Sequence, residues 1–495
     1  MTTLNAASLH ALSPAVSVPT YDRSAVGSGI VHFGVGNFHR AHEAMFIDRL
    51  LNAGDTEWGI CGVGVLPFDA AMKDTLAAQD GLYTLSTTSP QGVTESRIVG
   101  SLIEYLFAPD GPQAVMDKLV APETRIVSLT VTEGGYSVDD ATGEFAPNDE
   151  ATLSDLADSL SAPARLPRSV LGYIVESLRR RRECGIPAFT VMSCDNIQGN
   201  GLVAKVAVVG FAARRDPALA SWISEQVSFP SSMVDRITPA TTDETRAALR
   251  AAHDIEDLWP VHSESFEQWV LEDAFPLGRP AFDTVGVQLV DDVEPYELMK
   301  LRLLNASHQA MSYLGILSGA QSVHEVCTDP LFATFLRQYM HDEAIPTLQP
   351  VPGINLTAYC DQLVARFSSE AIRDTLARQV VDASDRIPKF LLPVVAEQLS
   401  RGGQISHASL VLAAWSVFLE GHTDAGTPTA PVDRRLAELS GAVAAEAERP
   451  GSFLDYAPVF GTLGANATLR AAFIAARASL KAQGARKTLT QLTQI

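Results

Sequence analysis

Features that mark several common functional classes are missing from this sequence of 495 residues. Its five cysteines are scattered, odd in number and form no C-x-x-C pair, which argues against a disulfide framework and favours a reducing compartment. No run of about 18 apolar residues occurs, so no membrane-spanning helix is predicted. The first Lys or Arg is Arg23, so the charged start of a signal peptide is missing as well. Together these absences predict a cytoplasmic protein.

Motifs for hydrolysis, phosphoryl transfer and zinc binding are also lacking. There is no G-x-x-x-x-G-K-[ST] phosphate loop and no G-x-S-x-G elbow. His39 and His42 are one helical turn apart, and His324-Glu325 precedes Cys327, but neither group has the full ligand set of a zinc site. We therefore expect no metal, and hydride transfer without a metal fits the inventory best.

Basic residues are scarce relative to acidic ones, with 37 Lys and Arg against 58 Asp and Glu and a formal net charge of −21. This balance argues against nucleic acid or an anionic membrane as the main partner. A small, polar, uncharged ligand is compatible with it, and so is a monomeric state. The chain is longer than the roughly 250–300 residues at which single cores stop growing, so at least two domains are predicted.

The N-terminal region contains a strand, a glycine turn and a helix in succession. Ile30–Phe33 is a short apolar run, and a helical pattern covers about 40–51. Between them, Gly34 permits a tight turn, and Gly36 lets the backbone approach a pyrophosphate at the helix N-terminus. The pattern indicates dinucleotide binding, but His39 stands where a third glycine is usual. A plain strand-to-helix turn is the alternative.

An acid follows the second predicted strand, Trp58–Val65. Asp69 can accept hydrogen bonds from an adenosine ribose, and no Lys or Arg between Leu66 and Met72 is available to bind a 2′-phosphate. Both observations favour NAD over NADP. The spacing from the glycine turn is longer than the usual ~20 residues, and Asp69 could equally cap the helix that follows it.

Two further strands end in polar residues. The strand 126–132 directly precedes Glu133, and the segment 188–196 is a strand that ends near Asn196. Residues just past the carboxyl ends of parallel strands face the ligand crevice in open α/β sheets, so both are candidate site residues. A helix cap is the alternative for Asn196. Another extended segment carries Asp235, and 285–293 is the last strand predicted.

The stretch Tyr296–Leu314 is predicted to be a buried helix, because it lacks Pro and Gly and is apolar on nearly all sides. At 100° per residue, Lys300, Asn305 and His308 fall within an arc of about 140°. Burial lowers the pKa of a lysine, and a lysine near neutrality can take a proton from an alcohol. The alternative is an interface lysine whose ammonium reaches water while its stem packs.

After about residue 290 helical patterns dominate. They cover 330–340, 356–367, 369–381, 389–399, 408–419, 432–447 and 468–483. We predict an α/β, Rossmann-type N-terminal domain with a mostly parallel sheet, residues 1–292, and a mainly α-helical C-terminal domain, residues 293–495. Arg378, Arg386 and Lys389 lie close together in sequence, either as a substrate clamp or as ordinary solvated surface.

Five segments are similar to the polyol-specific long-chain dehydrogenases. They are GVGNFHRAH at 34–42, SLTVTEGGY at 128–136, FTVMSCDN at 189–196, FPSSMVDRITP at 229–239 and KLRLLNASH at 300–308. The turn G-x-G-x-F-x-R-A is this family's variant of the glycine fingerprint, which accounts for His39. The resemblance implies a metal-independent, NAD-dependent oxidation of a polyol to a ketose, such as D-mannitol to D-fructose, and the reverse.

The resemblance also implies a role for each matching residue. Lys300 is the general base, Asn196 and Asn305 hold the reacting oxygen, His308 positions the substrate, and Glu133 lies on the proton's path to solvent. Asp235, Arg378 and Arg386 match positions at or around the polyol hydroxyls, although the family more usually has Lys at 386. The cofactor residues implied are Gly34, Gly36, Phe38, His39, Arg40 and Asp69. Phe68 stands where some relatives have a second acid, so NAD preference is less absolute here.

Other functions remain open at this point. D-arabinitol oxidation and reduction of a sugar acid such as fructuronate are rivals within the family, and Arg378 or Arg386 could bind a substrate carboxylate. A non-catalytic nucleotide-binding sensor is the rival from another class. A sensor needs the glycine turn but not a base, so the presence of Lys300 and Asn305 argues against it.

Overall fold

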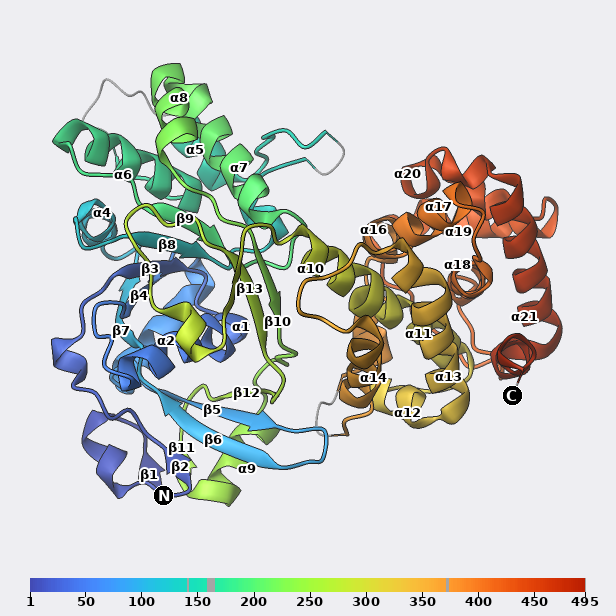
Figure 1. Ribbon diagram of the computed structural model, residues 1–495, viewed down its shortest axis with the longest axis horizontal. Coiled ribbons are helices and arrows are strands. Elements are labelled where there is room, and N and C mark those ends of the chain that lie inside the picture. Colours follow the sequence, from blue (N-terminus) through green and yellow to red (C-terminus); the bar gives the residue numbers. More distant parts are fainter. Residues whose placement is uncertain (140–141, 158–164, 371–373, 495) are drawn as a thin grey trace. The chain divides into compact units, whose positions relative to one another are not determined.

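The computed structural model describes residues 1–139, 142–157, 165–370 and 374–494 (Figure 1). The chain forms two compact units. The first comprises residues 1–89 and 93–293, and the second comprises residues 90–92 and 294–495. Over the described ranges, every helix is too short or too polar to cross a membrane.

A five-stranded parallel sheet forms the centre of the first unit. Its order is β7 (Leu102–Phe107), β4 (Ile60–Gly64), β3 (Ile30–Phe33), β8 (Ile126–Leu129) and β9 (Thr190–Ser193). From β3 the chain adds β4 and β7 on one side of the sheet and then β8 and β9 on the other, so the strand order reverses between β3 and β8. In this doubly wound arrangement the ligand crevice lies at the carboxyl ends of the central strands. The predicted Rossmann-type fold is confirmed.

Hydrophobic cores cover both faces of this sheet, because successive side chains of a strand point in opposite directions. Val31 and Phe33 of β3 belong to one core, which also receives residues of α6 (Val170–Cys184) and α7 (Asn200–Arg215). Ile30 belongs to the opposite core, with residues of α2 (Glu43–Asn52). Strands that are buried on both faces read as continuous apolar runs, which is why they were recognisable in the sequence.

Smaller sheets extend the first unit. One has the order β12 (Val261–Glu264), β5 (Tyr83–Thr88), β6 (Thr94–Val99) and β2 (Val16–Ser17). Another contains β10 (Ser232–Asp235), β13 (Gln268–Glu272) and β14 (Gln288–Val290), and β1 (Thr2–Thr3) pairs with β11 (Ile255–Glu256). After β6 the chain leaves this sheet at Val99 and enters the parallel sheet at Leu102.

The second unit is helical, as predicted. The segment expected to be one helix consists of α10 (Glu294–Met299), a π-helical turn (Lys300–Asn305) and α11 (Ala306–Leu317). The buried helix α18 (Ser406–Phe418) packs against α11 and against α21 (Ala467–Thr493). The other main helices are α12 (Val323–Thr328), α13 (Pro330–Gln338), α14 (Leu356–Phe367), α15 (Leu376–Gln379), α16 (Ala383–Phe390), α17 (Leu392–Ser400) and α19 (Leu436–Ala444).

Two helix predictions in this unit need correction. The helix expected over 369–381 is present only as the short α15, since Thr375 pairs with Ser322 in a β-bridge; residues 371–373 lie outside the described part. The helix expected over 389–399 is divided at Leu391 between α16 and α17. Pro388 lies inside α16, and a proline removes a backbone donor from the helix interior.

Candidate active site

The glycine turn follows β3 and has the geometry that the motif requires. Gly34 has φ of +96°, and a β-carbon there would lie 2.1 Å from the Thr130 carbonyl oxygen, so other residues do not fit. The Gly36 amide donates to the Gly34 carbonyl at 2.7 Å. A β-carbon at Gly36 would have no neighbour closer than 3.8 Å, so the backbone on that side is open to a ligand.

The residues after the turn form the short helix α1 (Asn37–Ala41) and are mostly buried. The Arg40 guanidinium donates to the Trp259 carbonyl and to Asn37 Oδ1, and burial lowers the pKa of Arg40 to about 10. The half-buried Phe38 ring stacks on His42 at 5.0 Å. His39 is also buried and faces the interior. The side chains of His39 and Arg40 are thus enclosed by protein groups, and direct contact of either one with a cofactor stays a prediction.

Asp69 lies at the tip of β4, next to β3. Its Oδ2 accepts hydrogen bonds from the Val65 and Leu66 amides, each at 2.9 Å. Asp69 precedes α3 (Ala70–Ala78), but its side chain makes no capping bond to that helix. The carboxylate is therefore fixed at the strand end, as ribose recognition would require. The neighbouring Phe68 side chain is 73% exposed.

Glu133 and Asn196 lie exposed just past the ends of the paired strands β8 and β9. The buried Asp195 connects the two strand ends. Its carboxylate accepts hydrogen bonds from the amides of Val131 at 3.0 Å and Thr132 at 2.9 Å. Burial raises the pKa of Asp195, although these bonds act in the opposite direction.

A second buried side chain joins β9 to β10. Asn200 Nδ2 donates to the carbonyls of Asp195 at 2.9 Å and Ser232 at 2.7 Å, and its Oδ1 accepts from the Ser232 amide at 2.9 Å. The strand that begins at Ser232 ends at the buried Asp235. Sequence reasoning missed Asp195 and Asn200. The sequence shows only that Asp195 is a polar residue just after an apolar strand and that Asn200 is one at the start of an apolar helix.

In the second unit, Lys300, Asn305 and His308 lie on the π-helical turn and the start of α11. Their exposed fractions are 7%, 8% and 9%. The Ala306 amide donates to the Leu301 carbonyl, an i to i−5 bond. Because a π-turn contains more residues than an α-turn, the 100° spacing used for the sequence does not apply here. Such turns occur frequently at functional sites.

Two features of this turn concern its polar side chains. Within the described residues, Asn305 Nδ2 is buried and has no hydrogen-bond acceptor. A buried donor without a partner is costly, so this amide is suited to a ligand oxygen. The His308 ring packs on Phe367 with 4.7 Å between ring centroids, which fixes the imidazole beside the turn.

The predicted clamp residues Arg378 and Arg386 belong to the same unit. Arg378 Nε and Nη2 each donate to the Asp374 carboxylate at 2.8 Å. Arg386 Nη1 donates to the Gln379 carbonyl at 3.2 Å, and the same carbonyl accepts from Gln309 of α11 at 3.0 Å. Both arginines are thus anchored by neighbours that sequence reasoning did not identify.

The fold and the glycine turn define a dinucleotide-binding protein with an appended helical unit. The Rossmann-domain model of the mannitol dehydrogenase family matches residues 28–284, and the model of its C-terminal domain matches residues 292–481. The chain belongs to the mannitol dehydrogenase family.

Individual relatives agree with this assignment. Mannitol 2-dehydrogenase of Phaeosphaeria nodorum is 44% identical over 96% of this chain and 83% of its own length. The structure of Pseudomonas fluorescens mannitol 2-dehydrogenase in a ternary complex with NAD and D-mannitol has 45% identity and a TM-score of 0.88, with 99% of each chain covered. A D-sorbitol dehydrogenase in substrate-free form has 37% identity and a TM-score of 0.91, over 98% of this chain and 100% of its own.

Proposed function

We propose that this protein is an NAD-dependent polyol dehydrogenase that interconverts D-mannitol and D-fructose without a metal. The observation that carries the proposal is the buried π-helical turn with Lys300 at its start and an Asn305 amide that lacks an acceptor among the described residues. The similarity to a mannitol 2-dehydrogenase solved with NAD and D-mannitol supports the choice of cofactor and substrate.

The residues of the first unit fit a dinucleotide. The open backbone at Gly36 suits close approach of a pyrophosphate, and the fixed Asp69 carboxylate suits the hydroxyls of a ribose. When bound, NAD⁺ supplies the hydride acceptor. We assign Gly34, Gly36, Phe38 and Asp69 to direct contacts, and His39 and Arg40 to the support of these contacts.

Oxidation of a secondary alcohol requires removal of the hydroxyl proton while the adjacent carbon loses a hydride. Lys300 takes the proton, for which it must be neutral, and burial favours the neutral form of an amine. The amides of Asn305 and Asn196 donate hydrogen bonds to the oxygen as negative charge develops on it. His308 orients the same oxygen, and Glu133, which is exposed, passes the proton to solvent.

The remaining polyol hydroxyls require polar groups at fixed positions. Asp235 can accept hydrogen bonds from them, and Arg378 and Arg386 can donate. The Arg378 side chain is 65% exposed although its guanidinium is paired with Asp374, so part of its donor set is still accessible. A polyol is uncharged, so it does not require an arginine whose charge is unpaired. Arginines that already donate to protein acceptors are therefore compatible with a polyol substrate.

The proposal is tested by the absorbance of NADH formed from NAD⁺, or of NADPH formed from NADP⁺, with purified protein. The substrates are D-mannitol, D-arabinitol and D-sorbitol, with D-fructose and fructuronate in the reverse direction. We expect the highest kcat/KM for D-mannitol with NAD⁺. Preference for D-sorbitol, which the similarity to a D-sorbitol dehydrogenase makes the nearest rival, would change the substrate but keep the reaction class.

A further inference from the structure

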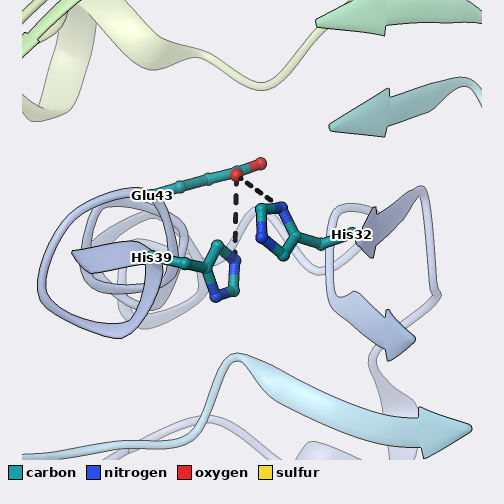
Figure 2. A group of neighbouring side chains, drawn as sticks. All are labelled: His32, His39 and Glu43. Atoms are coloured by element: carbon teal, nitrogen blue, oxygen red, sulfur yellow. Dashed lines mark ion pairs between the residues drawn. The ribbon is translucent and has the colours of Figure 1, made fainter. Parts of the chain in front are cut away.

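Three buried side chains, from residues that flank the glycine turn in the sequence, lie together (Figure 2). His32 comes from β3, His39 from α1 and Glu43 from α2, and each is at most 1% exposed. Glu43 Oε2 lies 3.2 Å from His32 Nδ1 and 3.7 Å from His39 Nε2. The two imidazole rings stack with 3.5 Å between centroids and 15° between their planes.

This composition is one that zinc accepts, and the potential ligand atoms all lie within 4.8 Å of one another. The ring geometry nevertheless argues against a metal. A ring nitrogen binds a metal through a lone pair in the plane of its ring, and two nearly parallel stacked rings cannot aim such lone pairs at one ion. Both His32 nitrogens also have hydroxyl partners already, Ser128 Oγ at 2.8 Å and Thr130 Oγ1 at 3.0 Å.

The hydrogen-bond directions lead from His32 to the glycine turn. Thr130 Oγ1 donates its single proton to the Gly34 carbonyl at 2.7 Å. It must therefore accept from its other partner, so His32 Nε2 carries a proton and donates it to Thr130. On the other side of the ring, Nδ1 faces Ser128 and the Glu43 carboxylate. The ring is held from both sides.

The Gly34 carbonyl is the acceptor that joins this support to the turn. Gly34 has a positive φ, and its carbonyl accepts hydrogen bonds from both the Thr130 hydroxyl and the Gly36 amide. We propose that His32 is a positioning residue for the dinucleotide: through Thr130 it fixes the Gly34 carbonyl and keeps the turn in its binding conformation before the cofactor arrives. Ser128 holds the Nδ1 side of the His32 ring in the orientation that this role needs. A preformed turn binds its ligand more tightly because no ordering is required on binding.

The inference rests on the proposed binding of NAD, and its test compares two substitutions at the half-buried Thr130. Thr130→Val keeps the shape and removes the hydroxyl, whereas Thr130→Ser keeps the hydroxyl. We expect Thr130→Val to raise the Kd of NADH about fivefold, the effect of one hydrogen bond. Thr130→Ser should stay within about twofold of the original protein on the same scale. KM for NAD⁺ should follow the Kd, while kcat at saturating NAD⁺ and the polyol KM change little.

A second pair of variants tests the histidine itself. The amide nitrogen of Gln can take the place of His32 Nε2, whereas that of Asn is too short, so His32→Gln should retain NADH binding better than His32→Asn. If both His32 variants fail to fold, the Thr130 pair decides alone. Equal NADH affinity for Thr130→Val and Thr130→Ser would overturn the inference. Absence of NADH binding by the unmodified protein would instead overturn the proposed function.

The metal alternative has its own measurement. The purified protein is dialysed against a chelator and its zinc content is determined by elemental analysis. We expect less than stoichiometric zinc and an unchanged Kd for NADH. One tightly bound zinc per chain, lost together with NADH binding in Glu43→Gln, would replace the positioning role with a metal site.

Discussion

The Asp195 carboxylate accepts a hydrogen bond from the Thr132 amide at 2.9 Å and so holds a threonine at a φ of +64°. Non-glycine residues rarely adopt this region, and such strain persists only where the surroundings impose it. Thr132 directly precedes Glu133, and Asp195 directly precedes Asn196. One buried carboxylate therefore sets the positions of two proposed site residues on neighbouring strands.

The first prediction concerns Asp195→Asn. The amide has one acceptor oxygen in place of two and turns a donor towards the Val131 or Thr132 amide. We expect a loss of roughly 1.5–3 kcal/mol in the free energy of unfolding, the range for a hydrogen bond to a charged group. Activity should fall as well, because Thr132 can relax. Urea unfolding and steady-state kinetics measure the two effects.

Asp216→Asn is the matched control for that variant. Asp216 accepts from the Ala218 and Leu219 amides as the cap of α8 (Pro217–Gln226), and asparagine caps helices about as well as aspartate. This control should be nearly neutral. Equal free energies of unfolding for the two variants would show that the hydrogen bonds of Asp195 are not what keeps Thr132 at a positive φ.

The second prediction concerns Lys300→Ala. Loss of a general base should reduce kcat by roughly 10²–10⁴-fold. NADH binding should be nearly unchanged, because the cofactor residues belong to the first unit. Stopped assays of NADH formation and a fluorescence titration with NADH measure the two quantities. Lys481→Ala, which removes an exposed lysine paired with Glu420, serves as the control. Near-normal turnover in Lys300→Ala would remove this lysine from the mechanism.

The third prediction concerns the Asn305 amide. Asn305→Ala removes one donor to the developing alkoxide, and removal of such a donor typically lowers kcat by about 10²–10³-fold. Asn305→Asp keeps the shape but places an acceptor against the oxygen, so its kcat should be lower still. Comparison of kcat for the two variants with D-mannitol at saturating NAD⁺ provides the test. A more active aspartate variant would contradict the donor role.

The fourth prediction concerns pH and the Asp374–Arg378 pair. Burial raises the pKa of the Asp374 carboxyl, but the hydrogen bonds and charge of Arg378 outweigh this and lower it below its ordinary value. Its contribution to stability is therefore complete above the unfolded value of about 3.9 and is lost as pH falls through the lower folded value. The exposed Arg378 limits the contribution to about 1 kcal/mol.

This pH dependence distinguishes the original protein from Asp374→Asn. In urea unfolding below about pH 4, the original protein should lose stability more steeply than the variant, because asparagine has no proton to gain. The difference in unfolding free energy between the two should be constant from pH 5 to pH 8. A difference that grows towards neutral pH would show that another group is coupled to this site.

The fifth prediction concerns the thiols. Of the five cysteines, only Cys184 is exposed, and the described structure contains no disulfide. Burial raises the pKa of Cys327 and of Cys360 to about 12, so these thiols are protonated and enclosed at neutral pH. The thiolate is the reactive form. A chromogenic thiol reagent should therefore modify one cysteine rapidly in each native chain and all five after the chain is denatured. In native Cys184→Ser no cysteine should react rapidly. Two rapid reactions in the native protein would mean that a second cysteine is accessible.

The local features of the fold were predictable from the sequence. The strand Ile30–Phe33 follows from a short apolar run, and the turn after it follows from the backbone freedom of Gly34. Both causes lie within the segment itself. The helical second unit was recognisable from its periodicity. In contrast, Asp195 acts on residues 63 and 64 positions away, and nothing near it in the sequence indicates those partners.

Two site features depend on irregular helices, which the spacing of residues in the sequence does not reveal. Angles of 100° per residue hold for Lys300 and Asn305 only in an α-helix, but the backbone there is π-helical. His39 and His42 are one turn apart only in a regular helix. The helix is broken at His42, which has φ of −120° and ψ of −97°, so His39 faces His32 while His42 packs against Trp269.

The π-helical turn also limits how this protein can vary. A π-turn contains one residue more than an α-turn over nearly the same rotation about the helix axis. A deletion of one residue between Lys300 and Asn305 would therefore restore an ordinary α-helix, while His308 and the buried face of α11 would keep their orientation. The spacing of Lys300 and Asn305 would change, so the number of residues in this turn is a constraint on the proposed site and not on the helix that follows it.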